Sequence, residues 1–281
     1  MKKTLFSLLL CCVVLAACKK DKLAPAQLEG TQKVTFKVGF AQTMGDIDIA
    51  NDKNKLKLAS SSDTSLTNYA DAIYYMIFKQ DGTLVQNITQ RLPVASFGEY
   101  TYFLPPGNYI VAIAAGKSLF INESGNINIQ KLSFADRVTG VDPSSIPDMF
   151  FKKMNITVGN NDVIETFTLK RATSKLTVNI KDALASTDYN LNLEITGVSK
   201  LFSVGTGMGE NTNTIIRTDN NIRLTGPNYK RSVTFFYKAP IKVRMELKNS
   251  NLAGSSSVKT ITDVVADPNS ETILSGYFYP H

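Results

Sequence analysis

Short stretches that alternate apolar and polar residues recur along the chain, and this period-two pattern constrains the fold more than any other feature. In residues 34–40, one face of an extended strand is wholly apolar and carries Val34, Phe36, Val38 and Phe40. Turn-forming residues recur at short spacing, and long stretches with helical periodicity are nearly absent. The sequence therefore predicts an all-β fold of the sandwich or barrel class.

Two turns are predicted in the first half of the chain. Residues 73–78 form an apolar strand, and the Asp-Gly pair at 81–82 precedes a return strand, so a hairpin is expected. Residues 105–108, Pro-Pro-Gly-Asn, form a second turn between predicted strands at 100–104 and 109–115. Both of those flanking stretches are rich in aromatic and β-branched residues, which suits a pair of neighbouring strands.

The remainder of the chain is mostly a succession of short strands. Residues 117–153 are less regular, and breakers such as Pro143 and Pro147 predict short helical turns there. Regular strands then resume, at residues 153–158, 163–169, 176–180, 190–195, 215–217, 222–224, 233–237, 241–247, 258–261 and 272–278.

The length of the chain favours two domains, because a folded region of about 250 residues is at the upper limit for one all-β unit. We place the boundary after Arg171, where one predicted strand has ended and a polar connection leads to the next set. The predicted organisation is a signal peptide at residues 1–17, a leash at 18–32, an N-terminal β-sandwich domain at 33–171 and a C-terminal β-sandwich domain at 172–281.

All three cysteines lie in the first eighteen residues. Two lysines precede an apolar run at 5–14, which is too short to span a bilayer of about 30 Å and is typical of a secretory signal. The tetrad Leu15-Ala16-Ala17-Cys18 resembles the bacterial lipobox. That resemblance implies cleavage between Ala17 and Cys18 and attachment of diacylglycerol and a further acyl chain, such as palmitate, to Cys18. An ordinary secretory signal with a chance cysteine is the alternative.

The expected mature chain is a lipid-anchored protein of the outer membrane, at the cell surface, that does not span the bilayer. It would keep Cys18 as its single cysteine, so no disulfide framework is expected. The formal net charge of +7 falls to +5 when Lys2 and Lys3 leave with the signal, and it is spread along the chain without a basic block. Nucleic acid is therefore not an expected partner.

Residues suited to catalysis or metal binding are scarce. His281 is the single histidine, which excludes histidine-based triads and His-rich metal sites, and no Gly-x-Ser-x-Gly motif is present. The Gly-rich residues 205–209 lack a strand–helix context and predict a loop rather than a phosphate cradle. Residues 46–52 offer four possible calcium ligands, but without EF-hand spacing a solvated polar loop is the simpler interpretation. We expect no enzyme, cofactor, metal or small-molecule substrate.

Three further motifs follow the lipobox in order: Ile-Tyr-Tyr-Met-Ile-Phe at 73–78 with Asp-Gly-Thr-Leu-Val at 81–85, Phe-Leu-Pro-Pro-Gly-Asn-Tyr at 103–109 with Ala-Ala-Gly at 114–116, and Leu-Lys-Arg-Ala-Thr-Ser-Lys-Leu-Thr-Val at 169–178. Together with the lipobox and leash they resemble the fimbrillin-like lipoproteins of Bacteroidetes, which comprise major fimbrial subunits and minor anchor subunits. The resemblance implies two tandem transthyretin-like β-sandwich domains of Greek-key-type topology, assembly into fimbriae with other fimbrial subunits, and a role in cell adhesion.

The resemblance also implies strand exchange. In stalk subunits of that family an arginine-specific protease removes the first strand, and the bared groove accepts a strand from a neighbour by edge pairing. Here the exchangeable strand would carry the apolar face named above, namely Val34, Phe36, Val38 and Phe40. The first arginine is Arg91, beyond that strand, so we expect an uncut strand and an anchor or minor subunit. Cleavage at Lys33 or within residues 46–62 by another protease remains an alternative.

A surface lipoprotein that binds glycans is the alternative function. Eleven tyrosines on a β fold could supply stacking faces for sugars, although the chain has no tryptophan. Tyrosines packed in the core are the simpler interpretation of the same composition.

Overall fold

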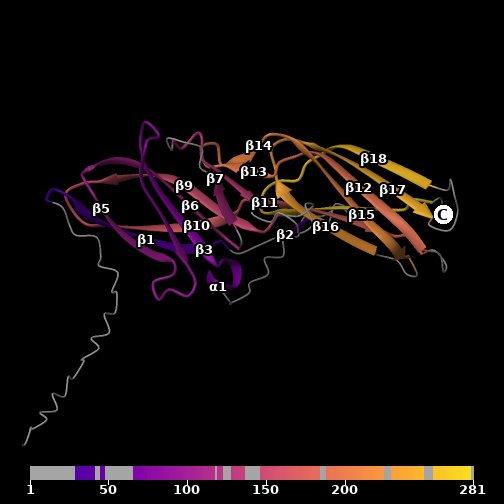
Figure 1. Cartoon of the computed structure of the whole chain (residues 1–281), viewed down its shortest axis with the longest axis horizontal. Coiled ribbons are helices and arrows are strands. Elements are labelled where there is room, and N and C mark those ends of the chain that lie inside the picture. The colour runs from indigo at the N-terminus through magenta and orange to yellow at the C-terminus, as the bar shows by residue number, and fades with distance from the viewer. Residues whose placement is uncertain are drawn as a thin grey trace, which may run out of the picture.

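The computed structural model describes residues 29–41, 45–47, 66–117, 119–122, 128–136, 146–183, 188–224, 229–249 and 256–279. Within these ranges the chain forms nineteen strands and one four-residue helix, α1 (Leu66–Tyr69), so the predicted all-β fold is confirmed. Figure 1 shows an elongated molecule, with β1 and β5 toward one end and β12, β17 and β18 toward the end marked C. No helix in the described part of the chain has the length and hydropathy needed to cross a membrane.

The first sandwich packs the layer β4-β3-β6-β9 against the layer β10-β1-β5. The two layers join at a corner, where β9 and β10 pair through Lys170–Phe151 and Arg171–Phe150. An apolar cluster fills the space between the layers, and Phe36 lies fully buried within it. The strands are β1 (Gln32–Phe40), β3 (Ala72–Lys79), β4 (Leu84–Arg91), β5 (Glu99–Leu104), β6 (Gly107–Gly116), β9 (Met149–Val158) and β10 (Val163–Arg171).

The unbroken apolar run at residues 73–78 has a structural cause, because β3 is buried on both faces. Within residues 73–78, the odd-numbered residues belong to the first core, and the even-numbered residues belong to a second buried cluster on the opposite face. The predicted hairpin to β4 is present. Asp81 Oδ1 accepts a hydrogen bond of 2.8 Å from the Thr83 amide, which lowers the pKa of Asp81, and Gly82 adopts a left-handed φ of 84°.

The second sandwich packs the sheet β16-β11-β19-β2 against the sheet β15-β12-β17-β18. Although β2 follows β1 in sequence, it joins this sheet and runs parallel to β19, from Gly45–Ser270 to Ile47–Thr272. It forms one edge of this sheet, and β16 forms the other. The strands are β2 (Gly45–Ile47), β11 (Thr173–Ile180), β12 (Asp188–Val198), β15 (Asn213–Arg223), β16 (Tyr229–Phe236), β17 (Ile241–Asn249), β18 (Ser256–Val264) and β19 (Ser270–Gly276).

A small sheet, β14-β13-β8-β7, connects the two sandwiches. Its strands are β7 (Leu119–Asn122), β8 (Ser133–Asp136), β13 (Leu201–Ser203) and β14 (Met208–Glu210). Phe202 of β13 lies 4.9 Å from Phe151 of β9 and 5.2 Å from Phe236 of β16, measured between ring centroids. One buried apolar cluster therefore runs from the outer face of β3 and β6 into the core of the second sandwich.

Two local predictions are wrong. The turn at residues 105–108 does not join paired strands, because β5 pairs with β1 while β6 pairs with β3 and β9. The turn instead carries the chain from one layer to the other, and Tyr109 Oη braces it by donating to the Pro105 carbonyl at 2.9 Å. The described parts of residues 117–153 form β7, β8 and the start of β9, with a hydrogen-bonded turn at residues 128–131 and no helix among them.

Candidate functional site

The first strand, β1, is an interior strand of its layer with partners along both edges. It runs parallel to β10, in register from Val34–Val163 to Phe40–Leu169. It runs antiparallel to β5, from Gln32–Leu104 to Lys37–Glu99. Because both rows of backbone groups are paired, β1 presents no free edge between Val34 and Lys37, where the two ladders overlap.

The predicted apolar face of β1 points into the first core. Val34 and Phe36 are completely buried, while Val38 and Phe40 are half-buried and pack against the same cluster. The Phe36 ring lies edge-on to Phe167 at 6.0 Å. The four side chains are thus brought together as the sequence predicts, and burying the first two contributes about 1.5–3 kcal/mol each.

The opposite face of β1 makes polar contacts, through a buried threonine and an exposed lysine. The Thr35 and Thr101 hydroxyls lie 3.1 Å apart, within hydrogen-bond distance. Lys37 Nζ lies 4.0 Å from Glu99 Oε2, with both side chains more than half exposed, so this ion pair contributes at most about 1 kcal/mol. Attachment of β1 therefore depends on its buried face and its two backbone ladders.

Polar side chains close the neighbouring edge of the sandwich, between β4 and β5. The Gln90 amide donates to the carbonyls of Ser96 at 3.2 Å and Glu99 at 2.7 Å, and it accepts from the Gly98 amide at 3.1 Å. Tyr75 Oη donates to Gln90 Oε1 at 3.1 Å. These hydrogen bonds hold β5 against the rest of the first sandwich, and so hold one of the two partners of β1.

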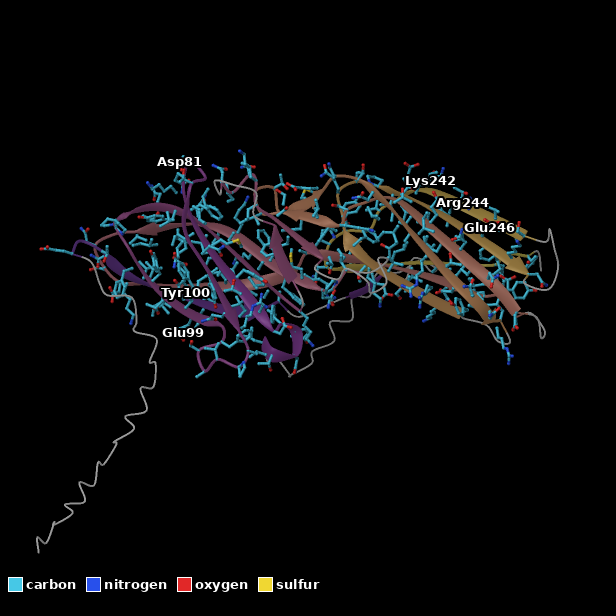
Figure 2. All side chains as sticks on the ribbon, in the orientation of Figure 1. Asp81, Glu99, Tyr100, Lys242, Arg244 and Glu246 are labelled. Carbon is cyan, nitrogen blue, oxygen red and sulfur yellow. The ribbon has the colours of Figure 1, made fainter. Side chains whose placement is uncertain are left out.

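The tyrosines around this edge stay neutral and serve as hydrogen-bonding and packing groups. Burial raises the pKa of Tyr75 well above its ordinary value, and the Glu99 charge raises it further. Burial also raises the pKa of Tyr100, whose ring lies 5.1 Å from that of Tyr75. Figure 2 shows Tyr100 and Glu99 together at the start of β5. Phenols held neutral in this way suit strand packing rather than acid–base chemistry.

The lipidation and cleavage residues, Cys18 and Ala17, lie outside the described residues. The first arginine, Arg91, ends β4, and its guanidinium donates to Tyr74 Oη at 3.1 Å. Lys33 is exposed and lies within β1, where its amide donates to Asp162 Oδ1 at 3.2 Å.

The other sequence predictions about sites concern loops. Residues 204–207 form a turn between β13 and β14, as predicted for this Gly-rich stretch. Of the possible calcium ligands, only Asp46 lies in a described element, β2. Across the described ranges, no group of three or more His, Cys, Asp or Glu side chains is arranged to hold a metal ion.

Sequence reasoning missed two features of the second sandwich. One is β2, whose pairing with β19 joins residues far apart in sequence. The alternation of aspartate and isoleucine at residues 46–49 is the sequence pattern that indicates this strand, whereas the sequence analysis predicts a polar loop there. The other is a hollow of about 220 Å³ between β18 and β19, far from β1, for which the sequence gives no signal.

Comparison with known proteins gives one family match. Residues 47–261 match the family described as fimbrillin-A associated anchor proteins Mfa1 and Mfa2. No curated protein matches the chain. The fold resembles the fimbrial anchor protein Mfa2 from Porphyromonas gingivalis, with a TM-score of 0.59, 12% identity, and coverage of 87% of this chain and 90% of that one.

Two further solved structures share the fold. A candidate adhesin from Bacteroides ovatus has a TM-score of 0.59 at 11% identity, with 88% of each chain covered. A protein from Bacteroides thetaiotaomicron, described as a candidate polysaccharide-binding protein, has a TM-score of 0.53 at 13% identity, with 80% of this chain and 78% of that chain covered. At these identities the structures establish the shared fold alone.

Proposed function

The chain belongs to the family of fimbrillin-A associated anchor proteins, and from this we propose that it is an anchor or minor subunit of a fimbrium. It would contact other fimbrial subunits through strands and support cell adhesion. The observation that carries the proposal is the position of β1, which is paired on both sides and precedes the first arginine, Arg91. A groove filled by the chain's own strand cannot accept a donor, so this chain would end a fimbrium rather than extend it.

A lipid on Cys18 would give this end its attachment to the outer membrane, at the cell surface. A single acyl chain binds membranes only marginally, at about 0.8 kcal/mol per buried CH₂, whereas two or more hold firmly. The lipobox tetrad, with cleavage after Ala17, supports this part of the proposal.

We further propose that the chain divides into two domains at residues 171–172. In support, β10 ends at Arg171 in one sheet and β11 begins at Thr173 in another, although β2 and β8 pair with strands from beyond this boundary. The apolar cluster that is continuous between the sandwiches indicates that the two domains would move as one body.

The decisive experiment is to identify the N-terminus of the protein taken from cells, by mass spectrometry. We expect an acylated Cys18 followed by an intact β1, and we expect Cys18→Ser to move the protein out of the membrane fraction. The matched control is Cys12→Ser, which alters a cysteine within the expected signal and should leave the protein in the membrane. A mature chain that starts beyond Phe40 would contradict the anchor role.

A deletion strain tests the fimbrial role separately. We expect cells without this chain to lose fimbriae into the medium, or to carry fewer of them, when imaged by electron microscopy. Unchanged fimbriae and unchanged adhesion would refute the fimbrial role. The glycan-binding alternative gains no support from the described residues, because Tyr277 is the one tyrosine among them that is broadly exposed.

A further inference from the structure

The Gly-rich turn at residues 204–207 lies where the two sandwiches meet, in a hairpin of the C-terminal half. The turn joins β13 to β14, which Figure 1 shows in the middle of the molecule. On its other side β13 pairs with β8 of the N-terminal half, with Phe202 opposite Phe134. The β13–β14 hairpin therefore crosses the proposed boundary at residues 171–172.

The tip of this hairpin, residues 204–207, is bound to the N-terminal half by two hydrogen bonds. The Val204 amide donates to the Leu132 carbonyl at 3.0 Å. The Lys153 ammonium group, on β9, donates to the Gly205 carbonyl. Because Leu132 and Lys153 lie on separate segments of the N-terminal half, the two bonds together resist rotation of the tip about either one.

The tip also fits too closely for a side chain at its centre. Gly205 is buried, and a Cβ atom there would lie 2.5 Å from Gln130 Oε1 and 3.0 Å from the Ile129 carbonyl oxygen. The Gln130 side chain can turn away, but the Ile129 carbonyl moves only with its backbone. Gly207 has a left-handed φ of 72°, and a Cβ atom there would lie 3.6 Å from Phe151 Cε1. The two glycines thus let the backbone of the tip lie directly against the N-terminal half.

The segment beneath the tip is itself fixed to the first sandwich. The Ile129 amide donates to the Gly82 carbonyl, in the turn between β3 and β4, at 2.9 Å. The Phe134 ring, on β8, lies edge-on to the Tyr74 ring, on β3, with their centroids 5.3 Å apart. Residues 129–134 therefore link the position of the tip to the position of β3.

The base of the hairpin is fixed to the second sandwich. Just before β13, the backbone groups of Ser199 and Phe236 exchange two hydrogen bonds, of 3.1 and 3.0 Å. The Gly209 amide, on β14, donates to the Tyr237 carbonyl at 3.1 Å. A Cβ atom at Gly209 would lie 3.0 Å from the Phe236 carbonyl oxygen, so the base and the end of β16 are in direct backbone contact. The hairpin therefore moves with β16.

We propose that the β13–β14 hairpin is a clasp that fixes the angle between the two sandwiches. Its base belongs to the second sandwich, and its tip is bound to the first. The apolar cluster that the sandwiches share holds them together, but apolar burial is non-directional and does not select one angle. Hydrogen bonds are directional and do select one. A clasp of this kind acts in the isolated chain, whatever the partners of the chain are.

Spin labels test the clasp directly, because two labels, one on each sandwich, report the distribution of distances between them. The labelled chain is full length, and its native cysteines are removed by Cys11→Ser, Cys12→Ser and Cys18→Ser. It carries Thr168→Cys on β10 and Lys242→Cys on β17 (Figure 2), both at exposed positions. We expect double electron–electron resonance to give one narrow distance in this parent chain.

Two variants open the clasp in different ways. Gly205→Val places a branched side chain against the Ile129 carbonyl, and Lys153→Met removes a hydrogen-bond donor without adding volume. We expect both to broaden the distance distribution, Gly205→Val more than Lys153→Met. The matched controls are Thr206→Val, at an exposed position of the same tip, and Lys79→Met, at an exposed lysine of β3. Both controls should keep the narrow distance.

Circular dichroism in urea shows whether each variant is folded before its distances are measured. Narrow distances in folded Gly205→Val and Lys153→Met would overturn the clasp, since the apolar cluster alone would then fix the angle. A broad distribution in the parent chain, or in either control, would overturn it as well. If Gly205→Val does not fold, Lys153→Met decides the outcome, because it creates no steric clash.

Hydrogen exchange gives a second readout, at the tip itself. The Val204 amide should be protected in the parent chain and should exchange faster in Lys153→Met, because the tip then separates more readily from Leu132. The Phe236 amide, which donates to the Ser199 carbonyl at the base, should stay equally protected in both chains. Unchanged exchange at Val204, or an equal loss of protection at Val204 and Phe236, would overturn the clasp.

Discussion

Replacing Phe36 with alanine tests whether β1 is held by its buried face. Truncating a buried phenylalanine costs about 3–5 kcal/mol, depending on how far the surroundings can collapse. Phe36 is 0% exposed and lies 6.0 Å from Phe167, on a strand fixed along both edges. The surroundings can therefore collapse little into the space left by the ring, and we expect the free energy of unfolding to fall by about 4–5 kcal/mol. With a urea dependence of about 2–3 kcal/mol per molar, the unfolding midpoint should fall by about 1.5–2 M.

The assay is urea unfolding of the purified chain, followed by circular dichroism, with Lys37→Ala as the matched control. Lys37 is the next residue on β1, its side chain is 51% exposed, and its ion pair with Glu99 is long. Lys37→Ala should therefore lower the free energy of unfolding by less than about 1 kcal/mol. A midpoint shift below about 0.5 M for Phe36→Ala would refute the reasoning. It would mean that the backbone ladders, rather than the apolar face, hold β1 in the groove.

Three further predictions concern the edges and the C-terminal segment. Asp182→Ala should destabilise the chain by about 2–3 kcal/mol and expose residues from Phe278 onward to carboxypeptidase, because it removes two hydrogen bonds to a buried charge. Gln90→Ala should lower the free energy of unfolding by about 1–3 kcal/mol and speed proteolysis before β5, because four hydrogen bonds are lost. Burial and the charge of Asp219 raise the pKa of Tyr229 to about 12. The contribution of Tyr229 to the free energy of unfolding is therefore complete below about pH 10 and is lost as the pH rises through about 12. Tyr229→Phe should lessen the fall of the urea unfolding midpoint at alkaline pH.

Each of these has a control within the chain. For Asp182, Asp188→Ala removes a more exposed carboxylate and should leave the C-terminal segment protected. For Gln90, Gln86→Ala removes one long hydrogen bond of 3.4 Å and should cost under about 1 kcal/mol. The argument for Asp182 is contradicted if Asp188→Ala also exposes the C-terminal segment to carboxypeptidase. The argument for Gln90 is contradicted if both glutamine variants lose the same free energy of unfolding. The argument for Tyr229 is contradicted if Tyr229→Phe leaves the alkaline fall of the unfolding midpoint unchanged.

Period-two patterns predicted the strands well where burial decides local structure. The apolar face of β1 and the run that β3 buries on both sides are visible in the sequence, since the side chains that must avoid water are neighbours in it. The hairpin between β3 and β4 was predictable for the same reason, because Asp81 and Gly82 encode its turn locally.

Strand pairing between distant residues could not be predicted. The stretch before Pro105 looks as suited to β6 as to β1, and only the three-dimensional layers decide that β5 pairs with β1. Likewise, nothing near Gly45 indicates that β2 adds to a sheet built from residues beyond Thr173. The hollow beside Ile261 is lined by residues of β11, β17, β18 and β19, which are far apart in the sequence, so no local motif marks it.

The parallel register of β1 and β10 has a mechanical consequence. The chain enters β1 at Gln32 and its ladder with β10 runs in register as far as Phe40–Leu169. A pull directed along the strand from its first residue loads these hydrogen bonds together, in shear, instead of opening them one at a time like a zipper. A protein tethered to a surface through this strand would resist tension best when the load acts along the direction of the tether.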